Sequence, residues 1–247
     1  MTQGSYTPSV RTVEIAGILS FAALAGIACV RLGPPAAQEP MLALGALLLG
    51  YFSADFASGV IHWAADTWGS MHMPILGRAF LRPFREHHLD PKAITRHDFI
   101  ETNGNNCIAS LPVLGVLATL IFETPASRFF AYWLFSLVAW LFVTNQLHKW
   151  AHTDVPPGWV AWLQRCRIIL PPTHHNVHHT PPYHRNYCIT SGWMNAPLAW
   201  MHLLPALETL ITHTTGALPR RDDLGEYAAL QMALENARRP APEHAAS

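Results

Sequence analysis

The chain has 247 residues, of which half are apolar and 13% are charged, against about 25% charged in a typical soluble domain. This deficit of charge favours a protein that is embedded in lipid. The formal net charge is zero, so the overall charge gives no reason to expect nucleic acid as a partner. The four cysteines are widely spaced and form no CxxC pair, which argues against a disulfide framework or a thiolate zinc site.

Four apolar stretches predict membrane-spanning helices, although the third is short. They cover residues 13–32, 41–63, 107–122 and 129–147. Pro34–Pro35 is expected to separate the first pair, and the turn at Glu123–Ser127 the second. The first stretch has an alternative interpretation as a signal peptide. No clear cleavage site follows it, however, so we predict a retained helix.

These spans place most of the polar chain on one side of the membrane. Residues 64–106 and 148–215 form a cap there, and residues 216–247 follow as a tail. All histidines fall on this side, whereas Arg31 and Arg128 are the only basic residues in the opposite loops. The positive-inside rule then makes the cap cytoplasmic. We therefore predict one all-α membrane domain, and the Ala- and Arg-rich composition suggests a bacterial inner membrane.

Two later apolar segments are predicted to lie on the membrane surface, or in the case of the second to re-enter the membrane, instead of spanning it. Residues 159–170 mix tryptophans with arginines, as an interfacial helix does. Residues 192–211 are interrupted by Pro197 and Pro205. Within the second span, Asp55 is notable because carboxylates inside a membrane are functional candidates by default.

The chain contains 15 histidines, and most of them fall in short motifs of the cap. Residues 171–182 read PPTHHNVHHTPP, and residues 145–152 read NQLHKWAH. On a helical turn, histidines three or four positions apart face the same side, and imidazole is the commonest metal ligand in proteins. The predicted ligands are His62, His87, His88, His148, His152, His175, His178 and His179, with His97 and His174 in reserve.

Eight or more imidazoles are too many for one ion and suit two. Zinc, copper, iron and nickel all accept imidazole, so the ligands alone do not name the metal. A dinuclear site without thiolates at a membrane surface is most economically a pair of irons that activates oxygen, and zinc can replace iron in a purified sample. Polar neighbours are expected to orient the ligands. The candidates for this role are Asp66, Asp90, Asp98, Glu101 and Asn145.

Four segments of this chain resemble the Kua/CarF family of plasmanylethanolamine desaturases. They read DFASGVIHWAADTWGS (55–70), RPFREHHLDPKAITRHDFIETNGNN (82–106), NQLHKWAH (145–152) and ILPPTHHNVHHTPPYHRNYCITSGW (169–193). The resemblance implies an integral membrane enzyme that converts the 1-O-alkyl chain of an ether phospholipid into a 1-O-alk-1′-enyl chain, with the histidines named above as the metal ligands. It departs from the family at Tyr183, where members tend to have histidine, so His184 is not carried over as a ligand.

The implied reaction needs O₂ and electrons from an outside donor, cytochrome b5-like or ferredoxin-like, because the chain has no flavin, haem or iron–sulfur motif. Arg78, Arg82, Arg85 and Lys92 are candidates to contact the lipid phosphate, with Arg82 and Arg85 predicted as the headgroup contacts, and the positive-inside bias is the alternative explanation of these charges. The alternatives are a desaturase of a phospholipid acyl chain, as in a plant relative, and a di-iron lipid hydroxylase. A zinc hydrolase fits less well, because it needs three ligands and a carboxylate base and the chain has more histidines than that. A metal transporter fits less well, since only Asp55 places charge within a span.

Overall fold

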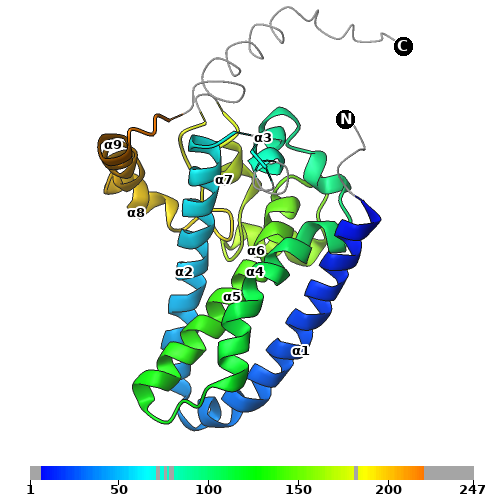
Figure 1. The fold of residues 1–247 in the computed structure, drawn as a ribbon, viewed down its shortest axis with the longest axis vertical. Coiled ribbons are helices and arrows are strands. Elements are labelled where there is room, and N and C mark those ends of the chain that lie inside the picture. Colours follow the sequence, from blue (N-terminus) through cyan, green and yellow to red (C-terminus); the bar gives the residue numbers. More distant parts are fainter. Residues whose placement is uncertain (1–6, 71–72, 75–76, 78–80, 181–182, 220–247) are drawn as a thin grey trace, which may run out of the picture.

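The computed structural model describes residues 7–70, 73–74, 77, 81–180 and 183–219, and this part of the chain is helical with no strand. Four long helices lie side by side as a bundle (Figure 1). They are α1 (Pro8–Gln38), α2 (Pro40–Thr67), α4 (Phe99–Thr119) and α5 (Pro125–Ala151). The short elements are α3 (Arg82–Leu89), η2 (Ala93–Arg96), α6 (Gly158–Arg165), α7 (Pro172–Asn176), α8 (Asn195–Trp200) and α9 (Leu203–Thr215). From residue 220 onward, the predicted tail lies outside the described residues.

Most of the long helices of the bundle have the length and apolar composition of membrane-spanning helices. Helices α1, α2 and α5 are each long and apolar enough to cross one. Helix α4 is not among the helices that are apolar enough to cross a membrane. It begins at Phe99, and its first turns carry the polar Asn103 and Asn106. It ends at Thr119, so residues 120–122 of the predicted third span lie beyond the helix.

The expected break at Pro34–Pro35 is wrong. Helix α1 continues through both prolines to Gln38, and Glu39 alone separates it from α2. The Glu39 N–H still reaches the carbonyls of Pro35 and Ala36, at 3.1 and 3.3 Å, which keeps the last turn hydrogen-bonded. A helix facing lipid gains from this continuity, because an open backbone has no water to bond there. The other turn lies where it was predicted, and there Thr124 caps α5 in a reciprocal pair with Ser127.

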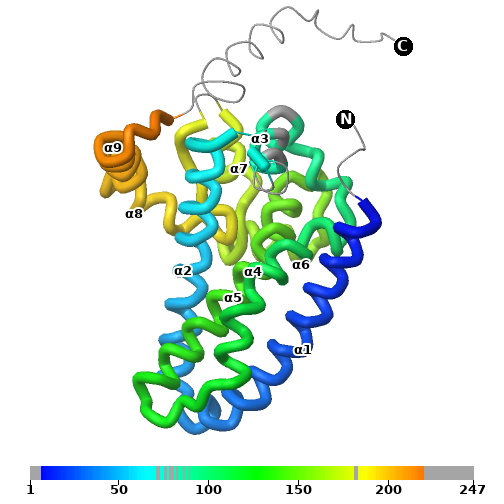
Figure 2. Tube along the Cα trace, in the orientation of Figure 1, coloured from blue at the N-terminus to red at the C-terminus, as the bar shows by residue number. Residues whose placement is uncertain are grey.

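The short helices gather at one end of the bundle, while the tight connections between the long helices lie at the other (Figure 2). Both segments predicted to lie on the membrane surface form short helices. Trp159 and Trp162 on α6 are exposed, and so is Trp200 at the end of α8. Helix α9 is attached to α2 where Trp63 Nε1 donates to the Glu208 carboxylate, at 2.7 Å.

A buried carboxylate joins α2 to the segment that follows the PPTHHNVHHTPP motif. Asp55, which is 0% exposed, accepts hydrogen bonds from four backbone N–H groups at 2.7–3.1 Å. The donors are Thr190, Ser191, Gly192 and Met194. Asp55 therefore closes a loop of the cap onto the bundle, a structural role that explains why a charge is kept inside a span.

The same segment approaches α2 closely at Gly59. A Cβ at Gly59 would lie 2.3 Å from Cys188 Sγ and 3.2 Å from the Cys188 backbone. We expect Gly59→Ala to lower the stability by about 1–3 kcal/mol, because the backbone has to move apart. Gly45→Ala in the same helix is the matched control, since its Cβ would lie 3.9 Å from Phe129 Cε2, an ordinary van der Waals distance. Thermal unfolding in detergent should separate the two variants; equal midpoints would contradict the close packing.

Candidate metal centre

The structure brings together all eight histidines that the motifs singled out, in two adjoining groups. Within each group, one ligand atom from every residue lies within 4.8 Å of all the others. The first group is His87, His148, His152, His175 and His179. The second group is His62, Asp66, His88 and His178. The two groups adjoin, because neighbouring residues of the same motif enter different groups.

Local helical geometry accounts for much of this convergence. His62 and Asp66 are one turn apart at the end of α2, and His148 stands one turn before His152 at the end of α5. Pro172 begins α7, as the sequence suggested, and His175 lies on this short helix. His175 and His179 keep the expected i,i+4 relation and share the first group, whereas His178 turns into the second.

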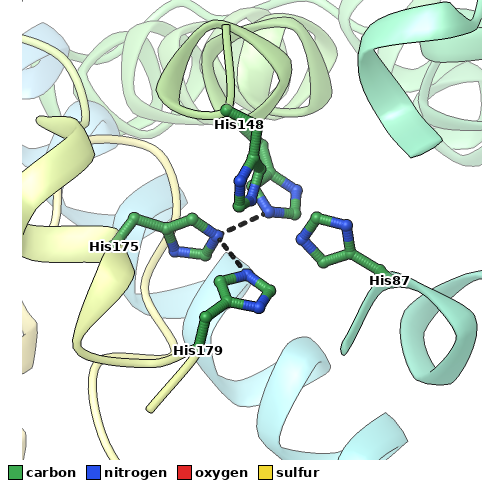
Figure 3. A group of neighbouring side chains, drawn as sticks. His87, His148, His175 and His179 are labelled. Atoms are coloured by element: carbon green, nitrogen blue, oxygen red, sulfur yellow. Dashed lines mark hydrogen bonds between the residues drawn. The ribbon is translucent and has the colours of Figure 1, made fainter. Parts of the chain in front are cut away.

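In the first group the imidazole nitrogens face one another (Figure 3). His175 Nε2 lies 2.8 Å from His148 Nε2 and 3.0 Å from His179 Nε2. Two nitrogens bound to the same ion at 2.0–2.1 Å would be roughly 2.9–3.4 Å apart at bond angles of 90–110°. The observed spacings are close to this range, so the rings already have the arrangement that a shared cation requires.

His87 and His152 give independent support for a cation in this group. Both ring nitrogens of His87 and Nε2 of His152 are buried, and no residue that the structure describes forms a hydrogen bond with them. A buried polar atom without a partner is costly and rare in native proteins. In a neutral imidazole one nitrogen carries a proton and the other a lone pair, so a metal ion would bind one nitrogen of each ring, and the chemistry of the five imidazoles fits one.

The second group has a mixed donor set. His88 Nε2 lies 3.1 Å from His178 Nε2. One carboxylate oxygen of Asp66, Oδ2, lies 3.1 Å from Nε2 of His88, 3.4 Å from that of His62 and 3.5 Å from that of His178. Sequence reasoning treated Asp66 as an orienting neighbour; its place among three histidines makes it a candidate ligand as well, and the orienting role stays a prediction. Three imidazoles and a carboxylate suit iron or zinc.

Backbone carbonyls set the tautomers of two ligands. His62 Nδ1 lies 3.1 Å from the Tyr187 carbonyl oxygen, and His178 Nδ1 lies 2.9 Å from that of Arg185. A carbonyl oxygen only accepts, so each Nδ1 carries the proton and each Nε2 keeps its lone pair. The residues that orient these rings are thus peptide groups of the chain after the last histidine motif, a role that sequence reasoning assigned to carboxylates.

Burial favours the neutral form of five histidines of these groups. It lowers the pKa of His87, His175 and His178 well below the usual value, and neighbouring imidazoles lower it further. For the same reasons the pKa of His152 falls to about 4 and that of His179 to about 2. Neutral imidazole is the form that binds metal, so no proton has to leave these rings at physiological pH.

Three histidines from the same motifs lie outside both groups. His97 is partly exposed, and its Nε2 lies 3.5 Å from Glu101. His174 Nε2 lies 3.0 Å from the side-chain amide of Asn195. His184 is exposed. The two reserve ligands, His97 and His174, are thus not brought to the centre.

The other polar candidates form structural contacts. Asp90 pairs with Arg96 at 2.5 Å. Asp98 caps α4 by accepting from the backbone N–H groups of Ile100 and Glu101, both at 3.0 Å. Asn145 donates to the Thr102 carbonyl at 3.0 Å and so ties α5 to α4. No contact between these three side chains and the histidine groups is found among the described residues, and their orienting role stays a prediction.

The two predicted headgroup arginines differ in what the structure describes. The Arg82 side chain lies outside the described part of the chain. Arg85 is 1% exposed and donates to the carbonyls of Trp68 and Gly69, at 2.9 and 2.7 Å. It therefore caps the end of α2, and this buried placement gives no support to a headgroup contact, which stays a prediction.

Substitution of Asp66 tests the composition of the second group. We expect Asp66→Asn to weaken metal binding there by about 10- to 100-fold, because a neutral amide is a poorer ligand. Metal analysis of the purified protein should show about one ion lost per chain. Asp90→Asn is the matched control. This variant should keep the full metal content if Asp90 only pairs with Arg96. A loss of metal equal to that of Asp66→Asn would mean that Asp90 orients a ligand.

Comparison with known proteins agrees with this centre. Residues 51–222 match the family model described as the lipid desaturase domain, and this segment contains every residue of both groups. No solved structure matches the chain.

The chain is 53% identical over 235 residues to plasmanylethanolamine desaturase of Myxococcus xanthus, an alignment that covers 95% of this chain and 83% of that protein. It is 47% identical over 193 residues to plasmanylethanolamine desaturase 1 of Mus musculus, covering 76% and 71%. It is 35% identical over 186 residues to the chloroplastic fatty acid desaturase 4 of Arabidopsis thaliana, covering 74% and 54%. The resemblance noted in the motifs is confirmed: the chain belongs to the lipid desaturase family that includes the plasmanylethanolamine desaturases.

Proposed function

We propose that this protein is a plasmanylethanolamine desaturase, which converts the 1-O-alkyl chain of an ether phospholipid into the vinyl ether of a plasmalogen. The observation that carries the proposal is the pair of adjoining histidine groups at one end of an apolar helix bundle. The names of the bacterial and mouse relatives supply the substrate.

The residues present fit two metal ions, and we propose that both are iron. The first group would hold one ion and the second group the other. When bound, the irons supply the activation of O₂. In the overall reaction C1′ and C2′ of the alkyl chain each lose one hydrogen and a carbon–carbon double bond forms between them. The two hydrogens leave with O₂, two protons and two electrons from an external donor as two molecules of water.

In this reaction the chain's own residues hold the ligand rings in a fixed orientation and exclude water from the centre. The carbonyls of Tyr187 and Arg185 hold the rings of His62 and His178 with Nε2 turned inward. His62, His175 and His178 are each 0% exposed, so bulk water is excluded from their rings. A fixed ligand set needs no reorganisation when the reaction occurs.

The proposal includes the arrangement in the membrane. We place four spans in the bilayer, with α4 as the fourth beside α1, α2 and α5, because α4 packs within the bundle (Figure 1). The histidine-rich cap and α1's N-terminal end then face the cytoplasm of a bacterial inner membrane. Only Arg31 and Arg128 lie near the opposite end, which agrees with the positive-inside rule. Residues 1–247 would form one desaturase domain.

Lipid mass spectrometry tests the function directly. Cells that lack plasmalogens would express the chain and receive a 1-O-alkylglycerol precursor. The expected product is an acid-labile alkenyl lipid that is lighter than its precursor by two hydrogens. A lipid heavier by one oxygen would show a hydroxylase instead. If only a fatty acyl chain loses hydrogens, the acyl-chain reaction suggested by the name of the Arabidopsis relative would replace this proposal.

A further inference from the structure

A hollow of about 510 Å³ lies directly beside the first histidine group. Its lining includes His152, which belongs to that group, and three charged side chains, Lys92, Lys149 and Asp154. Trp150 also lines it and packs against Trp159 of α6, with ring centroids 5.1 Å apart. Exposed tryptophans such as Trp159 are typical of the depth at which lipid headgroups lie. The hollow thus lies between a histidine of the first group and an exposed tryptophan, the side chain typical of the headgroup level.

The charges at its mouth are complementary to a zwitterion. Lys92 Nζ contacts both carboxylate oxygens of Asp154, at 2.8 and 2.6 Å. These side chains are 58% and 76% exposed, and a pair so accessible to water adds little stability. Exchanging their mutual contact for a ligand with one negative and one positive group therefore costs little. Lys149, whose Nζ donates to the His97 carbonyl, provides a second cation.

The covalent structure of the lipid demands a headgroup site close to the metal centre. In a 1-O-alkyl glycerophospholipid, six bonds separate C1′ of the alkyl chain from phosphorus, a span of at most about 8 Å at ordinary bond lengths. When C1′ is at the metal centre, the phosphate must consequently lie just beside the centre. Of the charged side chains described around the centre, those of the hollow share a cavity with a histidine of the first group.

We propose that this hollow binds the phosphoethanolamine headgroup of the lipid substrate, an assignment that rests on the function proposed above. Lys92 and Lys149 face the phosphate, and Asp154 faces the ammonium group. The assignment moves headgroup recognition away from the buried Arg85 and makes Asp154 the residue that distinguishes a zwitterionic headgroup from an anionic one.

Competition between two ether lipids tests the assignment without relying on activity. Purified protein would be mixed with equal amounts of two lipids that have identical alkyl chains, one with a phosphoethanolamine and one with a phosphoglycerol headgroup, and the bound lipid identified by native mass spectrometry. We expect a preference of about 10-fold for phosphoethanolamine in the unmodified chain. Asp154→Lys should abolish or invert this preference, and Lys92→Gln should weaken binding of both lipids.

Glu123→Lys is the matched control, because it makes the same change in net charge in the turn before α5, at the far end of the bundle. It should keep the original preference. An Asp154→Lys variant with the same lipid ratio as the unmodified chain would overturn the assignment.

Turnover of the same two lipids separates this inference from the function on which it rests. Asp154→Lys should raise KM for the phosphoethanolamine lipid at least about fivefold and leave kcat nearly unchanged, because the centre itself is intact. If the unmodified chain binds with the expected preference but desaturates neither lipid, the proposed function fails and the headgroup site stands. If it desaturates both lipids and the variant does so with unchanged KM, the headgroup site fails and the function stands.

Discussion

Replacing His87 by alanine should abolish desaturation, with a loss of at least about 100-fold in the alkenyl lipid formed. Both ring nitrogens of His87 are buried within the first group and lack a hydrogen-bond partner in the described part of the chain, so a metal ion is the partner that the geometry calls for. Loss of an outer-sphere contact already costs 10- to 100-fold in many metal enzymes, and loss of a ligand costs more. The purified variant should also contain less metal.

The matched control for this experiment is His97→Ala. His97 belongs to the same cap and is ten residues further along the chain, but it is partly exposed and contacts Glu101 instead of the histidine groups. Its replacement should leave product and metal within about twofold of the unmodified chain. Should His97→Ala be as inactive as His87→Ala, with both variants folded in the membrane, the grouping of ligands described above would be wrong.

Replacing Asp55 by alanine should have the largest effect on stability. Four backbone N–H groups of the cap lose their acceptor, in a region where Asp55 is 0% exposed and water cannot take its place. Each unsatisfied buried donor costs about 1–3 kcal/mol, so a loss of at least about 3 kcal/mol is expected. Thermal unfolding in detergent, read by the loss of helical circular dichroism, would measure it.

Asp55→Asn refines that experiment. Its amide oxygen can still accept from Thr190, Ser191 and Gly192, which all bond to Oδ1, while the amide nitrogen faces the Met194 N–H, which bonds to Oδ2. The asparagine variant should therefore be clearly more stable than the alanine variant. Equal losses would mean that the charge of Asp55, and not its hydrogen bonds, holds the segment.

Weakening the hydrogen bonds of Asp55 should also affect the metal centre. The loop that Asp55 holds is continuous with Tyr187 and Arg185, whose carbonyls orient two ligands. A weakened loop should thus lower metal content as well as stability, although Asp55 contacts neither histidine group. Metal analysis of Asp55→Asn alongside the unfolding measurement would show whether loop and centre are coupled.

Local periodicity determined a large part of this protein in advance. The apolar stretches specify helices because a backbone in lipid must satisfy its own hydrogen bonds, and the helix ends lie within a few residues of the predicted limits except at α4 and at Pro34–Pro35. The four-residue spacings place His148 with His152 and His175 with His179, because a helical turn repeats every 3.6 residues, whereas His174 and His178 have the same spacing and do not share a group. All eight main ligand candidates were accordingly found from the sequence and are brought together.

Only the tertiary structure decided how those ligands are divided and held. Adjacent residues such as His87 and His88, or His178 and His179, enter different groups, because α3 contacts α2 and α7 contacts α5, and neighbouring side chains on a helical turn point about 100° apart. The partners of the rings are carbonyls of a distant loop, and every residue has a carbonyl, so no side-chain pattern marks them. Arg85 was missed as a buried cap for the same reason: its acceptors at Trp68 and Gly69 are peptide groups, whose position depends on the fold alone.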